Sequence, residues 1–207
     1  MSSEGRRPYD IDSLTDVALG VFAERGYDGA SMDDVARAAG ITKASIYHHV
    51  SSKEALLERG LTRAVDALHA ILDEASGEEG DAATRLRAIV RRVSETTLRL
   101  LPELTVLFRA RGSSKSERRA LDERRRFDRA VTALVVEAQR DGTVRKDLDA
   151  RLVVRLVFGM SNSVVEWYRG GAALSPGAVA AAVEAIVFDG IGVTPKFPAP
   201  VARAGGN

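Results

Sequence analysis

The spacing of apolar residues is helical along almost the whole chain, and this pattern constrains the fold more than any other feature. From Ile11 onward the apolar side chains return every three or four residues, as at Leu14, Val17, Val21 and Phe22, which is the period of one helix face. No segment shows an alternating strand pattern that competes with this one. We therefore expect an all-α fold of about nine helices.

Capping residues and glycines set the helix boundaries in the N-terminal part. Ser31 and Asp34 have the spacing of a capping box, in which each side chain binds the other residue's backbone N–H, and Ser51 and Glu54 repeat that spacing. Glycine commonly follows the last turn of a helix. The helices expected here run from Ile11 to Gly26, from Ser31 to Gly40, from Thr42 to Val50, and from Ser51 through Leu72.

A polar stretch with two glycines, Gly77–Gly80, separates these helices from those of the C-terminal half. Pro102 and Pro176 mark helix starts, because a first turn accepts proline. The helices expected here run from Asp81 to about Leu100, from Pro102 to about Ala110, from beyond Ser116 to Asp141, from about Asp149 to Arg169, and from Ser175 through Val187. Three of the six prolines lie in the final 13 residues, so residues 192–207 are expected to form a disordered tail.

The composition is that of a soluble globular protein, with 45% hydrophobic residues, 29% charged residues and a mean hydropathy of -0.10. No apolar run approaches the roughly 18 residues of a membrane helix, and the polar start lacks the apolar core of a signal peptide. We expect a cytoplasmic protein with no membrane partner. The chain has no cysteine, which excludes disulfides, thiolate metal sites and cysteine nucleophiles.

Two short predicted helices separated by Gly40-Ile41 form a helix-turn-helix pattern. Val35 and Ile46 would pack inward, which leaves the other face of the second helix free. Side chains that are small or form hydrogen bonds can reach base edges and phosphates in a major groove. The free face carries Lys43, Ala44, Ser45, Tyr47 and His48. A helical hairpin whose polar face only meets water is the alternative.

The residues SMDDVARAAGITKASIYHHVSSKEALL, positions 31–57, resemble the DNA-binding module of the tetracycline-repressor (TetR) family. The resemblance extends to FAERGYDGAS at the end of the first helix. It implies a three-helix DNA-binding domain over residues 1–55 and an effector-binding and dimerisation domain over residues 56–191. It also implies a transcriptional repressor that binds a palindromic operator on double-stranded DNA as a homodimer and is released by a small-molecule effector.

The family's roles carry over to matching positions. The resemblance implies that Tyr47 and Lys53 contact phosphates, and the first turn of a helix adds free N–H groups and positive dipole to the charge of Lys53. Ser31 and Thr42 can touch phosphate besides capping their helices. The residues expected at the DNA are Ser31, Thr42, Lys43, Ala44, Ser45, Tyr47, His48 and Lys53. The last two helices are expected to form the dimer contact.

No pattern in the sequence indicates catalysis, a metal site or a cofactor. The motifs GxxxxGK[ST], HExxH and GxSxG are absent, and so is a GxGxxG that follows a strand. His48 and His49 are adjacent and point about 100 degrees apart on a helix. His69, with Asp66 and Asp73 near it in sequence, is interpreted as part of a solvated face. We therefore expect that the chain is not an enzyme.

The regulatory half is rich in arginine, with nine Lys+Arg against four Asp+Glu in residues 109–129. A solvated helix face explains this segment as well as an anion site does. Arg124 shares a helical stripe with Phe127, so its charge would lie at the mouth of an apolar pocket. Residues 164–176 resemble the C-terminal domain of TetR-family members that control fatty-acid, steroid or aromatic-acid degradation, several of which respond to acyl-CoA thioesters. The ligand-binding candidates are Phe108, Arg109, Arg124, Phe127, Asn162 and Trp167.

Two other functions remain open from the sequence. One is a helical ligand-binding protein without DNA-binding activity. The other is a multidrug-sensing repressor with a hydrophobic or cationic effector. An activator also fits, because the direction of coupling between the two sites leaves no mark in a sequence.

Charge is distributed unevenly along the chain. The net formal charge is +1, yet residues 1–60 hold seven Lys+Arg and ten Asp+Glu. Between Asp34 and Glu54 there is no acidic residue, so positive potential is expected to be confined to the helix-turn-helix. Restrained non-specific DNA binding follows from this distribution.

Overall fold

The computed structural model describes residues 10–169 and 174–189, and this part of the chain contains nine α-helices and no strand. The expected all-α fold is confirmed. The helices are α1 (Ile11–Arg25), α2 (Met32–Ala39), α3 (Lys43–Tyr47), α4 (Lys53–Ser76), α5 (Ala82–Arg99), α6 (Leu101–Arg109), α7 (Lys115–Arg140), α8 (Ala150–Trp167) and α9 (Pro176–Asp189). The tail expected for residues 192–207 lies outside the described residues.

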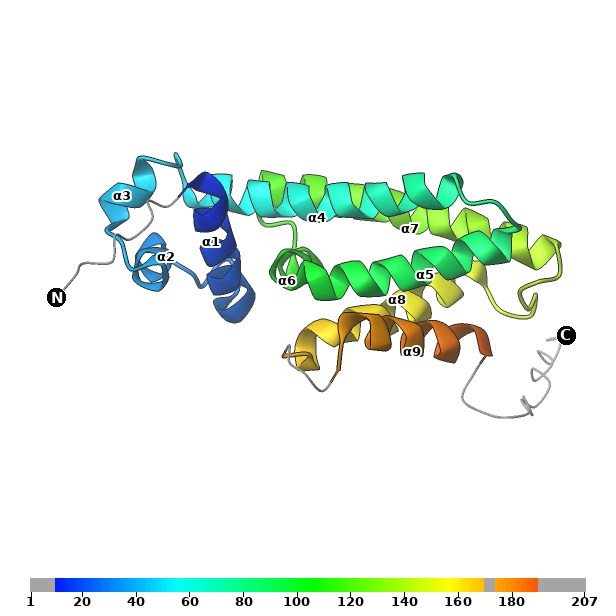
Figure 1. The fold of residues 1–207 in the computed structure, drawn as a ribbon. Helices are drawn as coiled ribbons and strands as arrows, with labels where there is room; N and C mark the ends of the chain where they lie inside the picture. Colours follow the sequence, from blue (N-terminus) through cyan, green and yellow to red (C-terminus); the bar gives the residue numbers. More distant parts are fainter. Residues whose placement is uncertain (1–9, 170–173, 190–207) are drawn as a thin grey trace, which may run out of the picture.

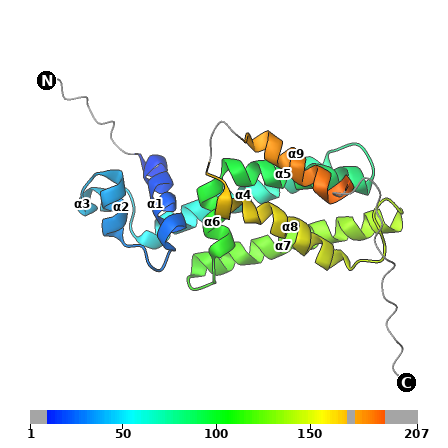
Figure 2. The same cartoon turned by 90° about the horizontal axis from the view of Figure 1, so that it is seen from below.

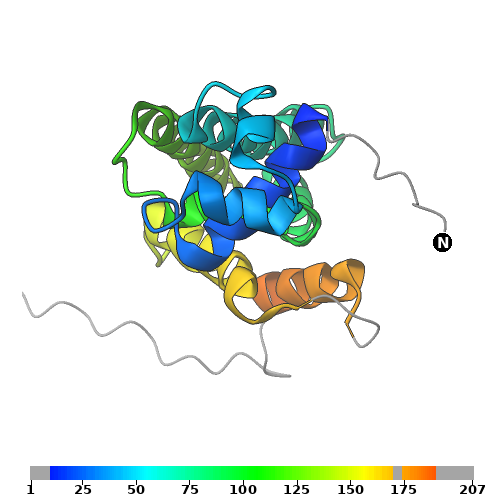
Figure 3. The same cartoon turned by 90° about the vertical axis from the view of Figure 1, so that its left-hand side faces the viewer.

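The helices form a small head and a longer body (Figure 1). The head consists of α1, α2 and α3, and the body consists of α4 to α9. Helix α4 starts at the head and runs along one side of the body, where it packs on α5 and α7. Helix α9 lies on the opposite side against α5, as the view from below also shows (Figure 2). Seen from the head, α9 lies at the outer edge of the body (Figure 3).

Caps define the helices of the head as the sequence predicts. The Ser31 and Asp34 side chains form a reciprocal capping box at the start of α2, and Thr42 caps α3 by accepting a hydrogen bond from the backbone N–H of Ser45. Gly40 ends α2 with φ 64°, in the left-handed region that favours glycine. These caps fix the turn between two very short helices, which could not persist alone.

Two boundaries differ from the prediction. Helix α4 is capped by Ser52, whose side chain accepts from the N–H of Ala55, so the capping box expected between Ser51 and Glu54 does not form. Glu54 instead accepts a hydrogen bond from the Ser116 hydroxyl of α7, at 3.1 Å. Val50 lies beyond the end of α3 but is still buried, at 7% exposure.

The body is held by apolar contacts among its long helices. Leu61 of α4, Val131 of α7 and Phe158 of α8 are all buried in one core that continues into the head. Phe127 and Phe158 join α7 to α8 with ring centroids 5.5 Å apart. The head and the body therefore share one continuous apolar core.

Large apolar side chains lie exposed on α8 and α9. Leu152 and Leu156 leave 46% and 61% of their surface exposed, and Ile186 leaves 42%. Leu152 and Leu156 are one turn apart and therefore share a face of α8. Exposed apolar side chains that lie together are typical of a protein contact or a ligand groove. No helix in the described part of the chain is long and apolar enough to cross a membrane.

Candidate DNA-binding surface and effector cleft

The outer face of α3 carries most of the residues predicted to meet DNA. Ile46 is fully buried and anchors the helix. On the other side Lys43, Ala44 and His48 are exposed, and Tyr47 leaves 47% of its surface exposed. A short helix with one apolar anchor and four exposed side chains has the shape needed to enter a major groove.

Three hydroxyls beside this face already have partners. The Ser31 hydroxyl lies 2.6 Å from the Asp34 carboxylate, and the Thr42 hydroxyl lies 2.8 Å from that of Ser45. The hydrogen bonds between Ser31 and Asp34 hold the pKa of the Asp34 carboxyl at about 2. Ser31 and Thr42 are exposed, so each can cap its helix and still be reached by a phosphate.

Lys43 is held by an acidic residue of the preceding helix. Its ammonium lies 2.9 Å from Oδ2 of Asp33, and this contact raises the pKa of Lys43 above its ordinary value. Both side chains are about half exposed or more, so water screens the pair and its contribution to stability is small. A contact between Lys43 and DNA would therefore either displace Asp33 or leave this ion pair in place.

Lys53 joins α4 to the loop between α1 and α2. Its ammonium donates to the backbone oxygens of Tyr27 and Ala30, each at 2.7 Å. The same ammonium lies 4.2 Å from the centre of the Tyr27 ring. An ammonium has three protons to donate, so one remains for a phosphate. The structure therefore gives Lys53 a structural role that the sequence did not reveal.

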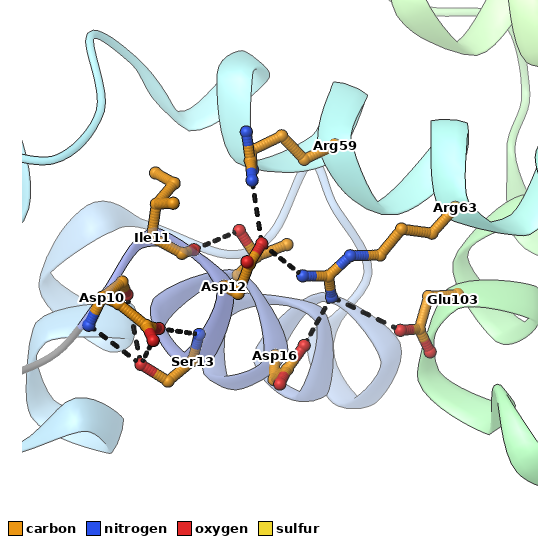
Figure 4. Close-up of polar contacts among 9 residues, drawn as sticks. Asp10, Ile11, Asp12, Ser13, Asp16, Arg59, Arg63 and Glu103 are labelled. Atoms are coloured by element: carbon orange, nitrogen blue, oxygen red, sulfur yellow. Dashed lines mark hydrogen bonds and ion pairs between the residues drawn. The ribbon is translucent and has the colours of Figure 1, made fainter.

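Ion pairs connect the head to the body around Arg63 (Figure 4). The Arg63 guanidinium lies 2.8 Å from Asp12 and 2.5 Å from Asp16, both on α1, and 3.7 Å from the buried Glu103 of α6. Arg59 also donates to Asp12, which holds the pKa of that carboxyl below its ordinary value. Three helices thus share one group of charges where the head meets the body.

Arg109 makes a second link at the other end of α6. It donates to the backbone oxygen of Ala23 in α1 at 2.7 Å and pairs with Glu166 of α8 at 3.0 Å. We predicted a ligand contact for Arg109, but its guanidinium lies at the joint between α1, α6 and α8. Its neighbour Phe108 lies under the guanidinium of Arg124, 4.9 Å from the ring centre.

A cleft of about 890 Å³ lies between α7 and α8. Polar and charged side chains form much of its wall, and Val154 and Phe158 form its apolar part. The lining residues are Arg124, Arg125, Asp128, Arg129, Thr132, Ala133, Arg151, Val154, Arg155, Phe158, Gly159 and Asn162. We call this site the arginine cleft.

The arginine cleft carries uncompensated positive charge. Among the described residues, no acidic side chain pairs with Arg129, Arg151 or Arg155 within 4 Å. Five arginines face one carboxylate, that of Asp128. Burial raises the pKa of the Asp128 carboxyl above its ordinary value, although the charges of Arg124 and Arg155 act in the opposite direction. Such a site attracts a small molecule with several negative charges.

An apolar pocket of about 470 Å³ adjoins the arginine cleft. It lies among α5, α7, α8 and α9, and Val90, Val131 and Val157 contribute to its wall. Val154 and Phe158 line both spaces. A charged cleft and an apolar pocket therefore meet at these two side chains, which suits a ligand with an anionic part and an apolar part.

The structure brings together some of the predicted ligand residues and separates others. Arg124 and Asn162 line the arginine cleft, and Phe127 is buried behind Phe158. Trp167 is half exposed at the end of α8 and lines neither space. The prediction omitted Asp128, Arg129, Arg151 and Arg155. The signal for the last two was their spacing of four residues on α8, in register with Asn162 further along.

No group of three or more metal-binding side chains lies within residues 10–169 and 174–189. His69 faces Glu123 of α7 at 3.4 Å, a contact that Asp66 and Asp73 do not share. The histidine thus belongs to the surface between α4 and α7.

Two family descriptions match the chain. Residues 14–59 match "Bacterial regulatory proteins, tetR family", and residues 79–191 match "Tetracyclin repressor-like, C-terminal domain". The transcriptional repressor KstR2 of Rhodococcus jostii RHA1 is 30% identical over 188 residues, covering 86% of this chain and 89% of that repressor. The first match contains most of α1, all of α2 and α3, and the start of α4. The second contains every residue that lines the arginine cleft and the apolar pocket.

Solved structures share the whole fold. SCO3833, a TetR-family member from Streptomyces coelicolor A3, has a TM-score of 0.81 at 48% identity, covering 90% of this chain and 93% of that one. AibR, in complex with isovaleryl coenzyme A and operator DNA, has a TM-score of 0.73 at 21% identity, covering 86% and 97%. The AibR similarity shows the fold alone.

Proposed function

The chain belongs to the TetR family of bacterial regulatory proteins, and on this premise we propose that it is a repressor released from its operator by an acyl-CoA. The proposal assigns DNA binding to the outer face of α3 and effector binding to the arginine cleft with its apolar pocket. It assigns the chain no catalytic residue and no cofactor, and it places the protein in the cytoplasm with the DNA.

The proposed repressor acts as a dimer. The exposed apolar face of α8 and α9, with Leu152, Leu156 and Ile186, supports a two-fold contact in which two helices of each subunit form a four-helix bundle. Two α3 helices would then reach successive major grooves about 34 Å apart, on a roughly palindromic operator. Leu156 and Ile186 also line the apolar pocket, whereas Leu152 does not. Replacing Leu152 with Asp is expected to give monomers in analytical ultracentrifugation and to weaken operator binding, because a charge would be buried at the contact.

The observation that carries the effector proposal is the junction of the two spaces at Val154 and Phe158. An acyl-CoA joins an apolar chain to a phosphate-bearing nucleotide. The acyl chain matches the apolar pocket, and the phosphates match Arg129, Arg151 and Arg155. The complex of AibR with an acyl-CoA and operator DNA supports this assignment by analogy of fold.

Effector binding reaches the head through α6 in this proposal. Arg124 of the cleft stacks on Phe108, and the next residue, Arg109, holds the end of α1 at Ala23. A ligand that draws Arg124 toward its phosphates would shift α6 and change the spacing of the two α3 helices. Any such ligand must bind the released state more tightly than the DNA-bound state.

A thermal-shift and calorimetric screen tests the effector class. The ligands are octanoyl-CoA, free CoA, octanoate and a planar organic cation, each measured with the full-length protein. We expect octanoyl-CoA to bind most tightly, since it alone fills both spaces. Stabilisation by the cation alone would contradict the proposal and favour a multidrug-sensing repressor.

A selection from random oligonucleotides tests DNA binding separately. We expect a palindromic sequence to be enriched, with half-site centres about 34 Å apart or slightly more. If no sequence is enriched, the chain is a ligand-binding protein without DNA-binding activity.

A further inference from the structure

Asp128 is the one residue of the arginine cleft whose charge opposes an anionic ligand. It lies on α7 in the wall of the cleft, with Arg124 one turn before it and Arg155 across from it on α8. A site that only had to bind phosphates would be stronger without this carboxylate, because a like charge weakens anion binding. Its presence therefore requires a reason in the ligand.

The Asp128 carboxylate has no hydrogen-bond donor in the part of the chain that the structure describes. The nearest hydroxyl on its own helix, that of Thr132, donates to the backbone oxygen of Asp128 at 2.7 Å. Arg125 donates to Asp122 at 2.6 Å. Arg124 stacks on Phe108, and it and Arg155 act on Asp128 only through space.

Asp128 is only partly buried, so water can donate to its carboxylate before a ligand binds. A ligand that displaces this water must replace the hydrogen bond or bind more weakly. Two ligand chemistries differ here. Sulfates, ionised phosphates and fatty carboxylates have acceptors alone and meet repulsion from the carboxylate. The nucleotide and pantetheine parts of a CoA thioester carry hydroxyl, amide and amino groups that can donate to it.

We propose that Asp128 is a specificity-determining residue of the arginine cleft, which accepts a hydrogen bond from an O–H or N–H group of the effector and rejects anions that lack one. This inference rests on the proposed effector site and narrows its ligand class. Specificity arises from a repulsive element beside an attractive one. The arginines attract any anion, and Asp128 selects among them.

The test compares two ligands that share an apolar chain and one negative charge but differ in donors. N-Octanoylglycine carries an amide N–H, and decanoate has no donor. Dissociation constants are measured by calorimetry for the wild type, for Asp128→Asn and for Asp141→Asn. Asp141 is the control, because it is an exposed acid at the C-terminal end of the same helix and lines neither space.

We expect Asp128→Asn to reduce the preference for N-octanoylglycine over decanoate about tenfold, because a neutral amide accepts a hydrogen bond less strongly than a carboxylate. Asp141→Asn should leave this ratio unchanged. Thermal unfolding checks that each variant is folded, and Asp128→Ser replaces Asp128→Asn if the amide does not fold.

A ratio that changes less than threefold in Asp128→Asn would overturn the role of Asp128, since both ligands would then respond only to charge. A different result would contradict the proposed function itself. If the wild type binds no octanoyl-CoA, the effector class is wrong and the selection by Asp128 is wrong with it.

Discussion

The cations of the head and those of the arginine cleft are held in opposite ways. In the head, Lys43 pairs with Asp33, Arg37 pairs with Asp34, and Lys53 donates to two backbone oxygens. In the cleft, within the described residues, Arg129 and Arg155 have no acidic partner within 4 Å. The cations of the head that face DNA are thus already paired with protein groups. The cations of the cleft that face a small molecule are not paired with an acid.

Under the proposed function, this difference lets a nearly neutral chain bind two kinds of anion. We expect compensated cations to keep the affinity for random DNA low, because contacts with phosphates must first displace existing partners. Uncompensated cations cost the folded body some self-repulsion but would give a small anionic ligand full electrostatic attraction.

The largest effect is expected from removing uncompensated charge. The double variant Arg129→Ala/Arg155→Ala should weaken octanoyl-CoA binding about a hundredfold, because hydrogen bonds to charged groups contribute roughly 1.5 to 3 kcal/mol each. Its operator affinity without ligand should match the wild type. Isothermal calorimetry measures the first quantity and fluorescence anisotropy the second.

Arg140→Ala is the control for that variant, because Arg140 lies on the same helix α7 but outside the cleft. It should bind octanoyl-CoA as the wild type does. Equal weakening by both variants would mean that the total charge of the body, and not the cleft, attracts the ligand.

The family resemblance implies that Lys43 lies where the recognition helix meets bases, so replacing it should alter sequence preference. Lys43→Ala is expected to cost roughly 1 to 3 kcal/mol on the selected operator and much less on random DNA. Asp33→Asn should strengthen binding to random DNA and steepen its salt dependence, because Lys43 loses its partner. Anisotropy titrations at several salt concentrations measure both effects. Identical changes on operator and random DNA would remove the base-reading role of Lys43.

Replacing Lys53 should affect stability and DNA binding together. Lys53→Gln is expected to lower the free energy of unfolding by about 2 kcal/mol, since two charge-assisted hydrogen bonds are lost or weakened. It should also weaken binding to all DNA sequences and reduce the salt slope by about one. Urea unfolding and anisotropy are the measurements. Unchanged stability with weaker DNA binding would assign Lys53 to phosphate contact alone.

The smallest effect in this series concerns the cap of α2. Ser31→Ala should lower the free energy of unfolding by about 1 kcal/mol, the usual cost of losing an N-cap side chain. Urea midpoints measure this effect at pH 7. Ser51→Ala is the control, because Ser51 does not cap α4.

The same cap has a pH dependence. The Asp34 carboxyl, with a pKa of about 2, is ionised in the folded protein well below its ordinary range. The stabilisation it gives is therefore complete above the unfolded pKa of about 3.9 and is lost as the pH falls toward 2. Asp34→Asn should be less stable than the wild type at pH 7 and equal to it near pH 2. A difference that persists at pH 2 would show that charge is not the cause.

The sequence predicts the helix boundaries of both head and body closely, for a physical reason. Caps such as Ser31 and Thr42 act within three residues, so their spacing alone places α2 and α3. The predicted cap of α4, Ser51, is one residue too early, because either of two adjacent serines can cap the same helix. Glu54 was then available to Ser116, a contact across 62 positions that local spacing does not contain.

The arginine cleft was predicted in part. Arg124 was chosen from its helical stripe, Asn162 was named as a plausible lining residue, and both line the cleft. Arg151 and Arg155 were missed because their place depends on how α8 packs against α7, which no local pattern encodes. Arg109 was named among the arginines that could meet an anionic ligand, but tertiary packing directs it to Ala23 of the head and Glu166 of α8.

The central claim is that a ligand in the arginine cleft controls the affinity of the head for its operator. The most direct measurement is the operator dissociation constant, by fluorescence anisotropy, with and without saturating octanoyl-CoA. We predict a rise of about tenfold for the wild type, within the usual range of allosteric coupling, and no rise for Arg129→Ala/Arg155→Ala at the same ligand concentration. An equal rise in both proteins, or none in a wild type that binds octanoyl-CoA, would contradict the claim.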